Sequence, residues 1–417
     1  MKLSEPGLKV SKDELLDAAA EIGHCLVRDA IRHDGKMTWI STKDSPTIAP
    51  WQKAIGTVGG DFYSGTSGIG YFLAVLARKT GDRQFRRAAI ESLEYAESLR
   101  SSGKMKSEPS FYCGLLGLAM AWTQLFLASQ LDFVFGRVRS LWGQIARTAP
   151  LCESWDVISG TAGIIPFMAL IGEFVGDRST VELINSSGML LINAAEHCEN
   201  GCSWRARGGV GRNLTGFAHG ASGVAAALLC AFEATGERVF SEHAVRAMDY
   251  EAFAFDNRLQ NWRDFRTSSS KSTDSGQFSC ANAWCHGAPG IAIARHHAMR
   301  HLGGDRWDAE CKTAIETTAK STLTLLNARD FNFSLCHGLC GNAEIASYCA
   351  AGQEQAERVA NLVPRVLKEH YLEFGARIPC GSYSLYESPG FMLGLAGIGH
   401  FLLRQSSPED VESIICN

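Results

Sequence analysis

The sequence predicts an all-α protein folded as an α/α toroid, a double ring of about seven inner and seven outer helices. A Gly-x-x-Gly pair opens a short apolar run seven times, at spacings of 46 to 67 residues. Amphipathic stretches with one polar face lie between these runs. Repetition at such spacings is typical of architectures built from one recurring unit. The pairs begin at Gly65, Gly114, Gly160, Gly220, Gly287, Gly338 and Gly394.

The runs that follow the glycine pairs predict the inner helices. "GTSGIGYFLAVLA" from Gly65 and "GASGVAAALLCAF" from Gly220 are apolar nearly all round, as a helix packed on every side should be. "RQFRRAAIESLEYAESL" from Arg83 and "RWDAECKTAIETTAKSTLTLL" from Arg306 have one polar face and predict outer helices. An inner helix followed by an outer one, seven times, closes into a ring. We therefore expect a single domain over residues 1–417.

The glycines predict where a site would lie. They allow a tight turn and leave the N-terminus of each inner helix uncovered by side chains. We therefore expect the residues just before each pair to face a common central cavity.

Composition excludes several classes of protein. The 417 residues are 46% apolar with a formal net charge of -4, which provides a large core and no electrostatic bias toward nucleic acid or membrane. The start, "MKLSEPGLKVSKDELLDAAAEI", has charges throughout, and no stretch of 18 uncharged apolar residues occurs. We expect a cytoplasmic protein that neither binds nucleic acid nor inserts stably into membranes. The 14 cysteines are expected to be reduced, most of them as small core residues.

Two of the repeats carry the same Cys-His pair. "WCHGAPG" spans 284–290 and "LCHGLCG" spans 335–341, so both pairs lie at the start of an inner helix. The positive end of a helix dipole favours thiolate, the form that binds metal. Two sulfurs and one nitrogen, from Cys285, Cys336 and a histidine of one pair, suit Zn²⁺ and leave one coordination position open.

These motifs carry a resemblance to a known family. "HGASG" at His219, "WCHGAPGI", "LCHGLCGN", "DVISGTAG" at Asp156 and "FYSGTSGIG" at Phe62 resemble the lanthionine synthetase C-like cyclase family over essentially the whole chain. The motifs are most similar to those of the cyclase domain of the class II synthetases. The resemblance implies an α/α toroid that binds one zinc and closes thioether rings in a ribosomally made peptide.

The resemblance also implies roles for individual residues. The family's zinc ligands correspond to Cys285, Cys336 and His337, which leaves His286 outside the metal shell as a pocket-lining residue. A peptide cysteine would attack the β-carbon of dehydroalanine or dehydrobutyrine, and the resulting enolate needs an acid. His219 is expected to be the general acid and base. Asp156 either orients His219 or the thiol, or caps a helix.

The substrate would be a dehydrated precursor peptide, which we expect a separate dehydratase to supply. Two loops are candidates for contacting it. The segment 201–216 offers Arg205, Arg207 and Arg212 to acidic groups, or is an ordinary solvated loop, and 267–277 is polar and expected to be flexible. Family members often carry a basic residue just before Trp-Cys, where "SCANAWC" has no charge. Its role would fall to His219, to an arginine from another loop, or to nothing.

Other classes of protein share parts of this pattern. A protein prenyltransferase is also a toroid with zinc, but its ligand set would be a mixture of Asp, Cys and His. A toroidal terpene cyclase would need an aspartate-rich motif, and no Asp-Asp pair occurs. A glutathione-adding enzyme of the cyclase-like branch would use the same zinc on a small thiol. A non-catalytic, zinc-containing peptide-binding scaffold is the remaining alternative.

Overall fold

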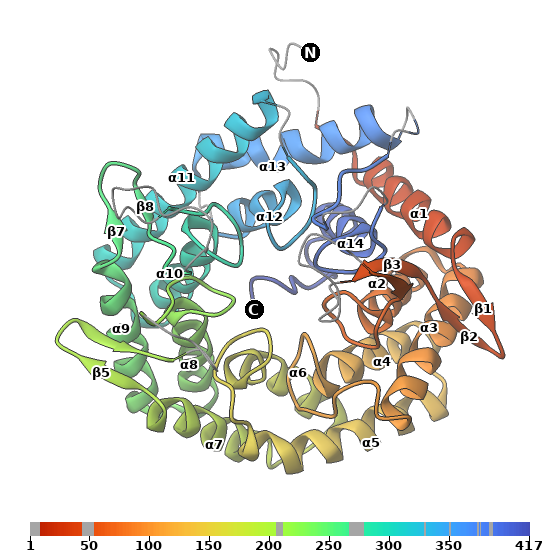
Figure 1. The fold of residues 1–417 in the computed structure, drawn as a ribbon, viewed down its shortest axis with the longest axis horizontal. Helices are drawn as coiled ribbons and strands as arrows, with labels where there is room; N and C mark the ends of the chain where they lie inside the picture. Colours follow the sequence, from red (N-terminus) through yellow and green to blue (C-terminus); the bar gives the residue numbers. More distant parts are fainter. Residues whose placement is uncertain are drawn as a thin grey trace.

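A computed structural model describes residues 9–43, 54–205, 212–266, 279–328, 331–349, 352–372, 375, 377–382 and 387–417. Within these ranges, fourteen α-helices form two concentric rings, which confirms the predicted toroid (Figure 1). The inner ring contains α2 (Thr66–Thr80), α4 (Leu115–Ser129), α6 (Ile165–Val175), α8 (Ala221–Thr235), α10 (Ala288–Leu302), α12 (Leu339–Cys349) and α14 (Leu395–Ser406). The outer ring contains α1 (Lys12–Arg28), α3 (Arg83–Ser101), α5 (Asp132–Thr148), α7 (Thr180–Asn193), α9 (Arg238–Ala252), α11 (Asp305–Ala328) and α13 (Glu354–Leu367).

The ring closes by joining the two ends of the sequence. Six inner helices pack on the outer helix that follows them, as the sequence predicts. The outer partner of α14 is instead α1, from the other end of the chain. Helix α1 begins at a capping box formed by Ser11 and Glu14 and buries one apolar face, as its amphipathic pattern requires. None of the helices in the described ranges is both long and apolar enough to span a membrane.

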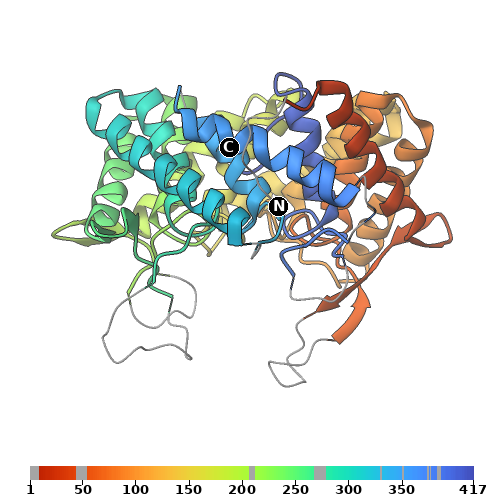
Figure 2. The same ribbon diagram turned by 90° about the horizontal axis from the view of Figure 1, so that it is seen from above.

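Short elements that the sequence analysis did not anticipate connect the helices. Two 3₁₀ turns (Ala149–Leu151 and Thr161–Gly163) and one π-helical turn (Lys368–Leu372) adjoin helices. The strands form antiparallel hairpins of β1 (Ile31–His33) with β2 (Lys36–Thr38), β3 (Ile40–Lys43) with β4 (Ala54–Thr57), β5 (Glu196–Cys198) with β6 (Gly201–Ser203), and β7 (Phe255–Asp256) with β8 (Asn261–Trp262). Figure 2 shows several of these connections gathered on one side of the ring.

The glycine pairs are needed for close packing rather than for unusual backbone angles. The first glycine usually caps its helix in an extended conformation, as at Gly65, where φ is -103°. A side chain on the second glycine would overlap the chain's own preceding loop: a Cβ on Gly341 would overlap the carbonyl oxygen of Leu335. Only Gly287, among the first glycines, has a positive φ, at 89°. Each loop therefore folds back over the start of its own helix.

Backbone hydrogen bonds join neighbouring loops around the ring. We call the two residues before each first glycine the tip residues. The Met392 amide donates to the carbonyl of Tyr63 (2.8 Å), and the Cys336 amide donates to the carbonyl of Met392 (3.0 Å). The Ala218 amide likewise donates to the carbonyl of Cys285 (3.1 Å). Between the described loops of Cys285 and Cys336 no such bond is made, and their two sulfur-bearing tips meet there.

A fully buried ion pair supports the loop that precedes α8. Glu251 of α9 and Arg295 of α10 are each 0% exposed, with 3.0 Å between carboxylate and guanidinium. One carboxylate oxygen of Glu251 accepts from the amides of Gly216 (2.8 Å) and Ser222 (2.9 Å), and the other accepts from the Ser222 hydroxyl. A buried carboxylate is tolerated only with such partners. An outer helix thus fixes the loop that carries His219.

Replacing Glu251 with Ala should lower the free energy of unfolding by about 3 kcal/mol, since Arg295 loses a buried partner and two amides lose their acceptor. Urea denaturation followed by circular dichroism measures the change. Lys312→Ala, which breaks an exposed pair with Asp308, is the control and should cost about 0.5 kcal/mol or less. Equal changes in the two variants would contradict the role assigned to Glu251.

Candidate active site

The tip residues of six of the seven repeats line one cavity of about 460 Å³. This confirms, for six of the seven repeats, the expectation that residues before the glycines face a common space. The tip residues of the seventh, Met392 and Leu393, are not part of this lining. Two further residues, from the loop before α2 and the loop after β8, complete the wall. The lining consists of Asp61, Tyr63, Ser64, Cys113, Ile158, Ala218, His219, Arg266, Cys285, His286, Cys336 and His337.

Two thiols lie side by side in this cavity. The neighbouring Cys336 thiol lowers the pKa of Cys285, and the nearby Arg266 and His219 act in the same direction against burial. The same contact with Cys285, together with burial, raises the pKa of Cys336 well above its ordinary value. The hydroxyl of Tyr63 donates a hydrogen bond to Cys336 Sγ at 3.0 Å. The pair therefore favours one thiolate on Cys285.

His337 has one ring nitrogen free, as a metal ligand requires. Its Nε2 donates to the carbonyl oxygen of Gly381 at 2.9 Å, which leaves Nδ1 with a free lone pair. A backbone carbonyl on the far nitrogen commonly fixes the tautomer of a ligating histidine. Two thiols and this imidazole line the same cavity and match the donor chemistry of zinc. Over the described residues, however, no three metal-binding side chains are already gathered around one point.

His286 lies against the wall of the cavity. Burial lowers its pKa to about 4, so the ring is neutral at physiological pH. Its Nδ1 is 3.3 Å from the carbonyl oxygen of Thr215, to which it donates. Its Nε2 is buried and, among the described residues, has no hydrogen-bond partner. His286 therefore lines the pocket, as the sequence predicts, and its Nε2 offers a lone pair that can accept a hydrogen bond there.

His219 and Asp156 form a hydrogen-bonded pair. His219 Nδ1 lies 2.7 Å from Asp156 Oδ2, so the carboxylate holds the proton on Nδ1 and leaves Nε2 free. The other oxygen of Asp156 accepts from the amide (2.7 Å) and hydroxyl (3.0 Å) of Ser159. Asp156 thus orients His219, one of the two roles expected from the sequence. Its bonds to Ser159 close a turn and do not cap a helix, since neither the 3₁₀ turn Thr161–Gly163 nor α6 has a side-chain cap. The His219 side chain is 40% exposed, which leaves it accessible from the cavity.

Arg266 is the cation that sequence reasoning did not locate. It follows β8 and precedes the cysteine of the fifth repeat by 19 residues. Its guanidinium binds Asp264 through Nε (2.9 Å) and a terminal nitrogen (2.5 Å), and it lines the cavity beside both thiols. "SCANAWC" indeed carries no charge, and Arg266, which lies earlier in the same connection between β8 and α10, lines the cavity instead. The sequence alone does not show that this connection folds back to bring Arg266 beside the thiols.

Tyr63 and Asp61 are two further cavity residues that the sequence analysis did not name. Asp61 accepts from the amide of Ser64 (2.8 Å), and burial raises its pKa. It precedes its glycine by four residues, as Asp156 does, so this match was a signal that could have identified it. Tyr63 lies two residues before the first glycine of its repeat, the position that Cys285 and Cys336 occupy in theirs.

Several other tryptophan, histidine and arginine side chains lie away from the cavity. Trp284 is fully buried, and its indole donates to the carbonyl of Ile415 at 2.8 Å, so it is a core residue. His297 is buried, with its Nε2 3.0 Å from the carbonyl of Cys416. Arg205 pairs with Glu196 of β5, and the guanidinium of Arg212 lies 5.5 Å from the ring of Phe265. Arg207 and the segment 267–277 lie outside the described residues.

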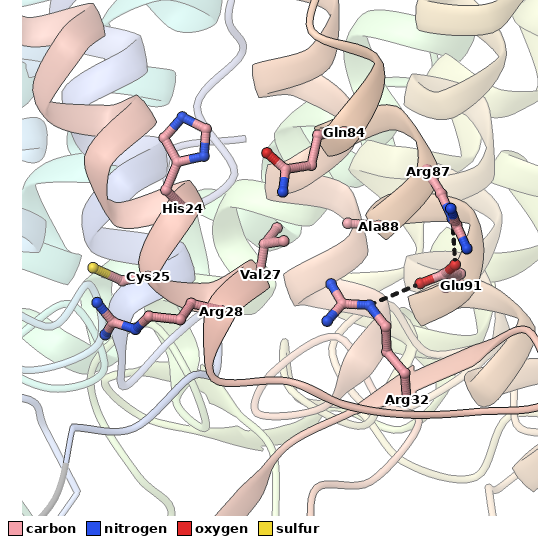
Figure 3. Close-up of a pocket in the computed structure, with 9 residues that line it drawn as sticks. All are labelled: His24, Cys25, Val27, Arg28, Arg32, Gln84, Arg87, Ala88 and Glu91. Carbon is pink, nitrogen blue, oxygen red and sulfur yellow. Dashed lines mark hydrogen bonds and ion pairs between the residues drawn. The ribbon is translucent and has the colours of Figure 1, made fainter.

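A separate cavity of about 660 Å³ opens on the outer wall between α1 and α3. Figure 3 shows Arg32 and Arg87 there, both paired with Glu91 at 3.2 and 2.7 Å, and Arg28 nearby. Since Arg28 itself binds Asp29, these arginines are largely balanced by carboxylates. This hollow contains none of the thiols of the candidate active site.

The fold and the site define a helical toroid with a thiol- and histidine-lined centre, and comparison with known proteins agrees. The family described as lanthionine synthetase C-like protein matches residues 56–415. The chain belongs to this family.

Known relatives support the assignment. The lacticin 481/lactococcin biosynthesis protein LcnDR2 of Lactococcus lactis subsp. lactis is 25% identical over 95% of this chain, which spans 41% of that protein. The nisin biosynthesis protein NisC of the same organism is 23% identical over 68% of this chain and 72% of its own length. A solved structure of nisin cyclase superposes with a TM-score of 0.62 at 20% identity, over 85% of this chain and 89% of that chain, which shows a shared fold.

In metal-free protein, iodoacetamide should label Cys285 faster than Cys336 at pH 7, because the lowered pKa gives Cys285 the larger thiolate fraction. Arg266→Ala should raise the pKa of Cys285 and slow labelling by about tenfold for each pKa unit gained. The difference should vanish at a pH above both values. Peptide mapping by mass spectrometry measures the rates, with Arg263→Ala as control. Faster labelling of Cys336 would contradict the assignment.

Proposed function

We propose that the chain is a zinc-dependent lanthipeptide cyclase. It would close lanthionine and methyllanthionine rings by adding peptide cysteines to dehydroalanine or dehydrobutyrine. One observation carries the proposal: a single cavity contains two thiols and an imidazole with one free ring nitrogen, together with a carboxylate-held histidine. Membership of the lanthionine synthetase C-like family supports the same reaction class.

Cys285, Cys336 and His337 are the proposed zinc ligands. When bound through these three groups, zinc would lower the pKa of a peptide cysteine at its open coordination position. In this proposal Tyr63 holds Cys336 by donating a hydrogen bond to its sulfur. The carbonyl of Gly381 similarly keeps the proton of His337 on Nε2.

His219 is the proposed proton donor. Addition of the thiolate to the β-carbon leaves an enolate that must be protonated at the α-carbon. With Nδ1 held by Asp156, His219 can accept the thiol proton on Nε2 and return it to this carbon. Arg266 faces the same cavity from its pairing with Asp264 and would balance the negative charge of the enolate. It would thereby fill the role of the basic residue absent before Trp284.

The substrate is proposed to be a precursor peptide whose serines and threonines have been dehydrated. A dehydratase must act first, since the reaction consumes dehydroamino acids, and we propose that a separate protein supplies this activity. Two relatives are named as biosynthesis proteins, one for lacticin 481 and lactococcin and the other for nisin, which supports a substrate of this class.

Intramolecular addition conserves every atom, so cyclisation should protect peptide thiols from alkylation without changing peptide mass. The protein is incubated with a dehydrated precursor peptide, alkylated, and the peptide mass measured. Prenylation would instead add an isoprenoid, and glutathione addition would add the tripeptide. A scaffold would leave the thiols fully alkylated. Cys336→Ala and chelator treatment are the controls. If the thiols remain protected under both conditions, zinc is not needed for cyclisation.

Replacing His219 with Asn should slow cyclisation by about a hundredfold or more, the usual scale for a lost general acid or base. The zinc content, measured by elemental analysis, should remain at that of the unmodified protein. His286→Ala is a matched control at an equivalent tip position and should also keep the metal. Loss of zinc from the His219 variant would instead make His219 a ligand.

A further inference from the structure

A second pair of thiols lies outside the candidate active site. Cys311 is on outer helix α11, and Cys349 is the last residue of inner helix α12, while α10 packs on both helices (Figure 1). Both cysteines are free, and they are only 3% and 4% exposed. Their thiols are neighbours, and Cys311 Sγ is also 3.7 Å from the carbonyl oxygen of Ala292.

An imidazole completes this cluster. His296 of α10 lies beside Cys311, and its ring packs on that of Tyr348 with 5.1 Å between centroids. Its Nδ1 is buried and has no hydrogen-bond partner among the described residues. The neighbouring Cys349 thiol and this imidazole lower the pKa of Cys311 to about 6, whereas burial raises that of Cys349. One thiolate beside one thiol is the arrangement from which disulfides form.

We propose that Cys311 and Cys349 form a redox site, which a peroxide oxidises reversibly to a disulfide that joins α11 to α12. Cys311 gives its proton to His296, and its sulfur attacks one peroxide oxygen. The O–O bond breaks, and the leaving hydroxide takes that proton from His296 and becomes the first water. The Cys349 sulfur then attacks the sulfenic acid and releases a second water as its own proton is lost. Two thiols and one hydrogen peroxide thus give one disulfide and two waters.

This site is spatially separate from the candidate active site. His296 is eight residues into α10, and Cys349 ends α12, so the cluster lies about 12–15 Å along these helices from their N-termini. Cys285 and Cys336 precede those N-termini. Oxidation of the second pair therefore consumes no proposed zinc ligand, and the proposal does not depend on cyclase activity.

Peptide mapping of the full chain tests the proposal. Zinc-supplemented protein is treated with roughly equimolar hydrogen peroxide at pH 7 and alkylated, and its peptides are compared with and without reduction. A linked pair of peptides containing Cys311 and Cys349, released by dithiothreitol, is the expected result. His296→Asn should slow its formation several-fold. Cys349→Ser should leave Cys311 as a sulfenic acid that dimedone traps, whereas Cys202→Ser, which removes another buried thiol, should change neither result.

Two results would overturn the proposal. The first is full alkylation of both Cys311 and Cys349 in protein whose other thiols have been oxidised. The second is linkage of either residue to a different cysteine. Both are read from the unmodified chain, so they remain decisive if a variant fails to fold.

Discussion

The close fit of each loop over the start of its own helix is the constraint on which the rest of this structure depends. A side chain on the second glycine of a pair would occupy the position of a loop carbonyl, as at Gly68 and Phe62. With hydrogen in its place, the loops approach closely enough for backbone hydrogen bonds to pass from one tip to the next. The tip side chains must then face the cavity. The repeated glycines thus direct residues from six repeats to one point.

The outer ring contributes to the site through buried polar groups. Glu251 of α9 holds the amides on both sides of His219, and Asn261 of β8 accepts from the first amide of α10 at 2.9 Å. Burying a carboxylate is costly, and here the cost is offset by an arginine and three donors. Substitutions far from the cavity should therefore alter its geometry through the backbone.

Charge in the cavity is distributed unevenly. Two adjacent thiols cannot both ionise easily, so proximity lowers one pKa and raises the other. Arg266 favours the thiolate and is itself fixed by the nearly buried Asp264. The same guanidinium helps to keep His286 neutral. Arg266 thereby influences three cavity groups, Cys285, His286 and Cys336.

The sequence by itself determined the repeat number, the helical class and the identity of the tip residues. Glycine spacing and the period of apolar residues are local properties, and they are sufficient to place His219, Cys285 and His337 at the same end of successive inner helices. Only the tertiary structure decided that α1 is the partner of α14, that Asp156 binds His219, and that Arg266 reaches the thiols. No local repeat or period sets the sequence separation of the residues in these contacts. Whether the residues meet therefore depends on how the whole ring closes.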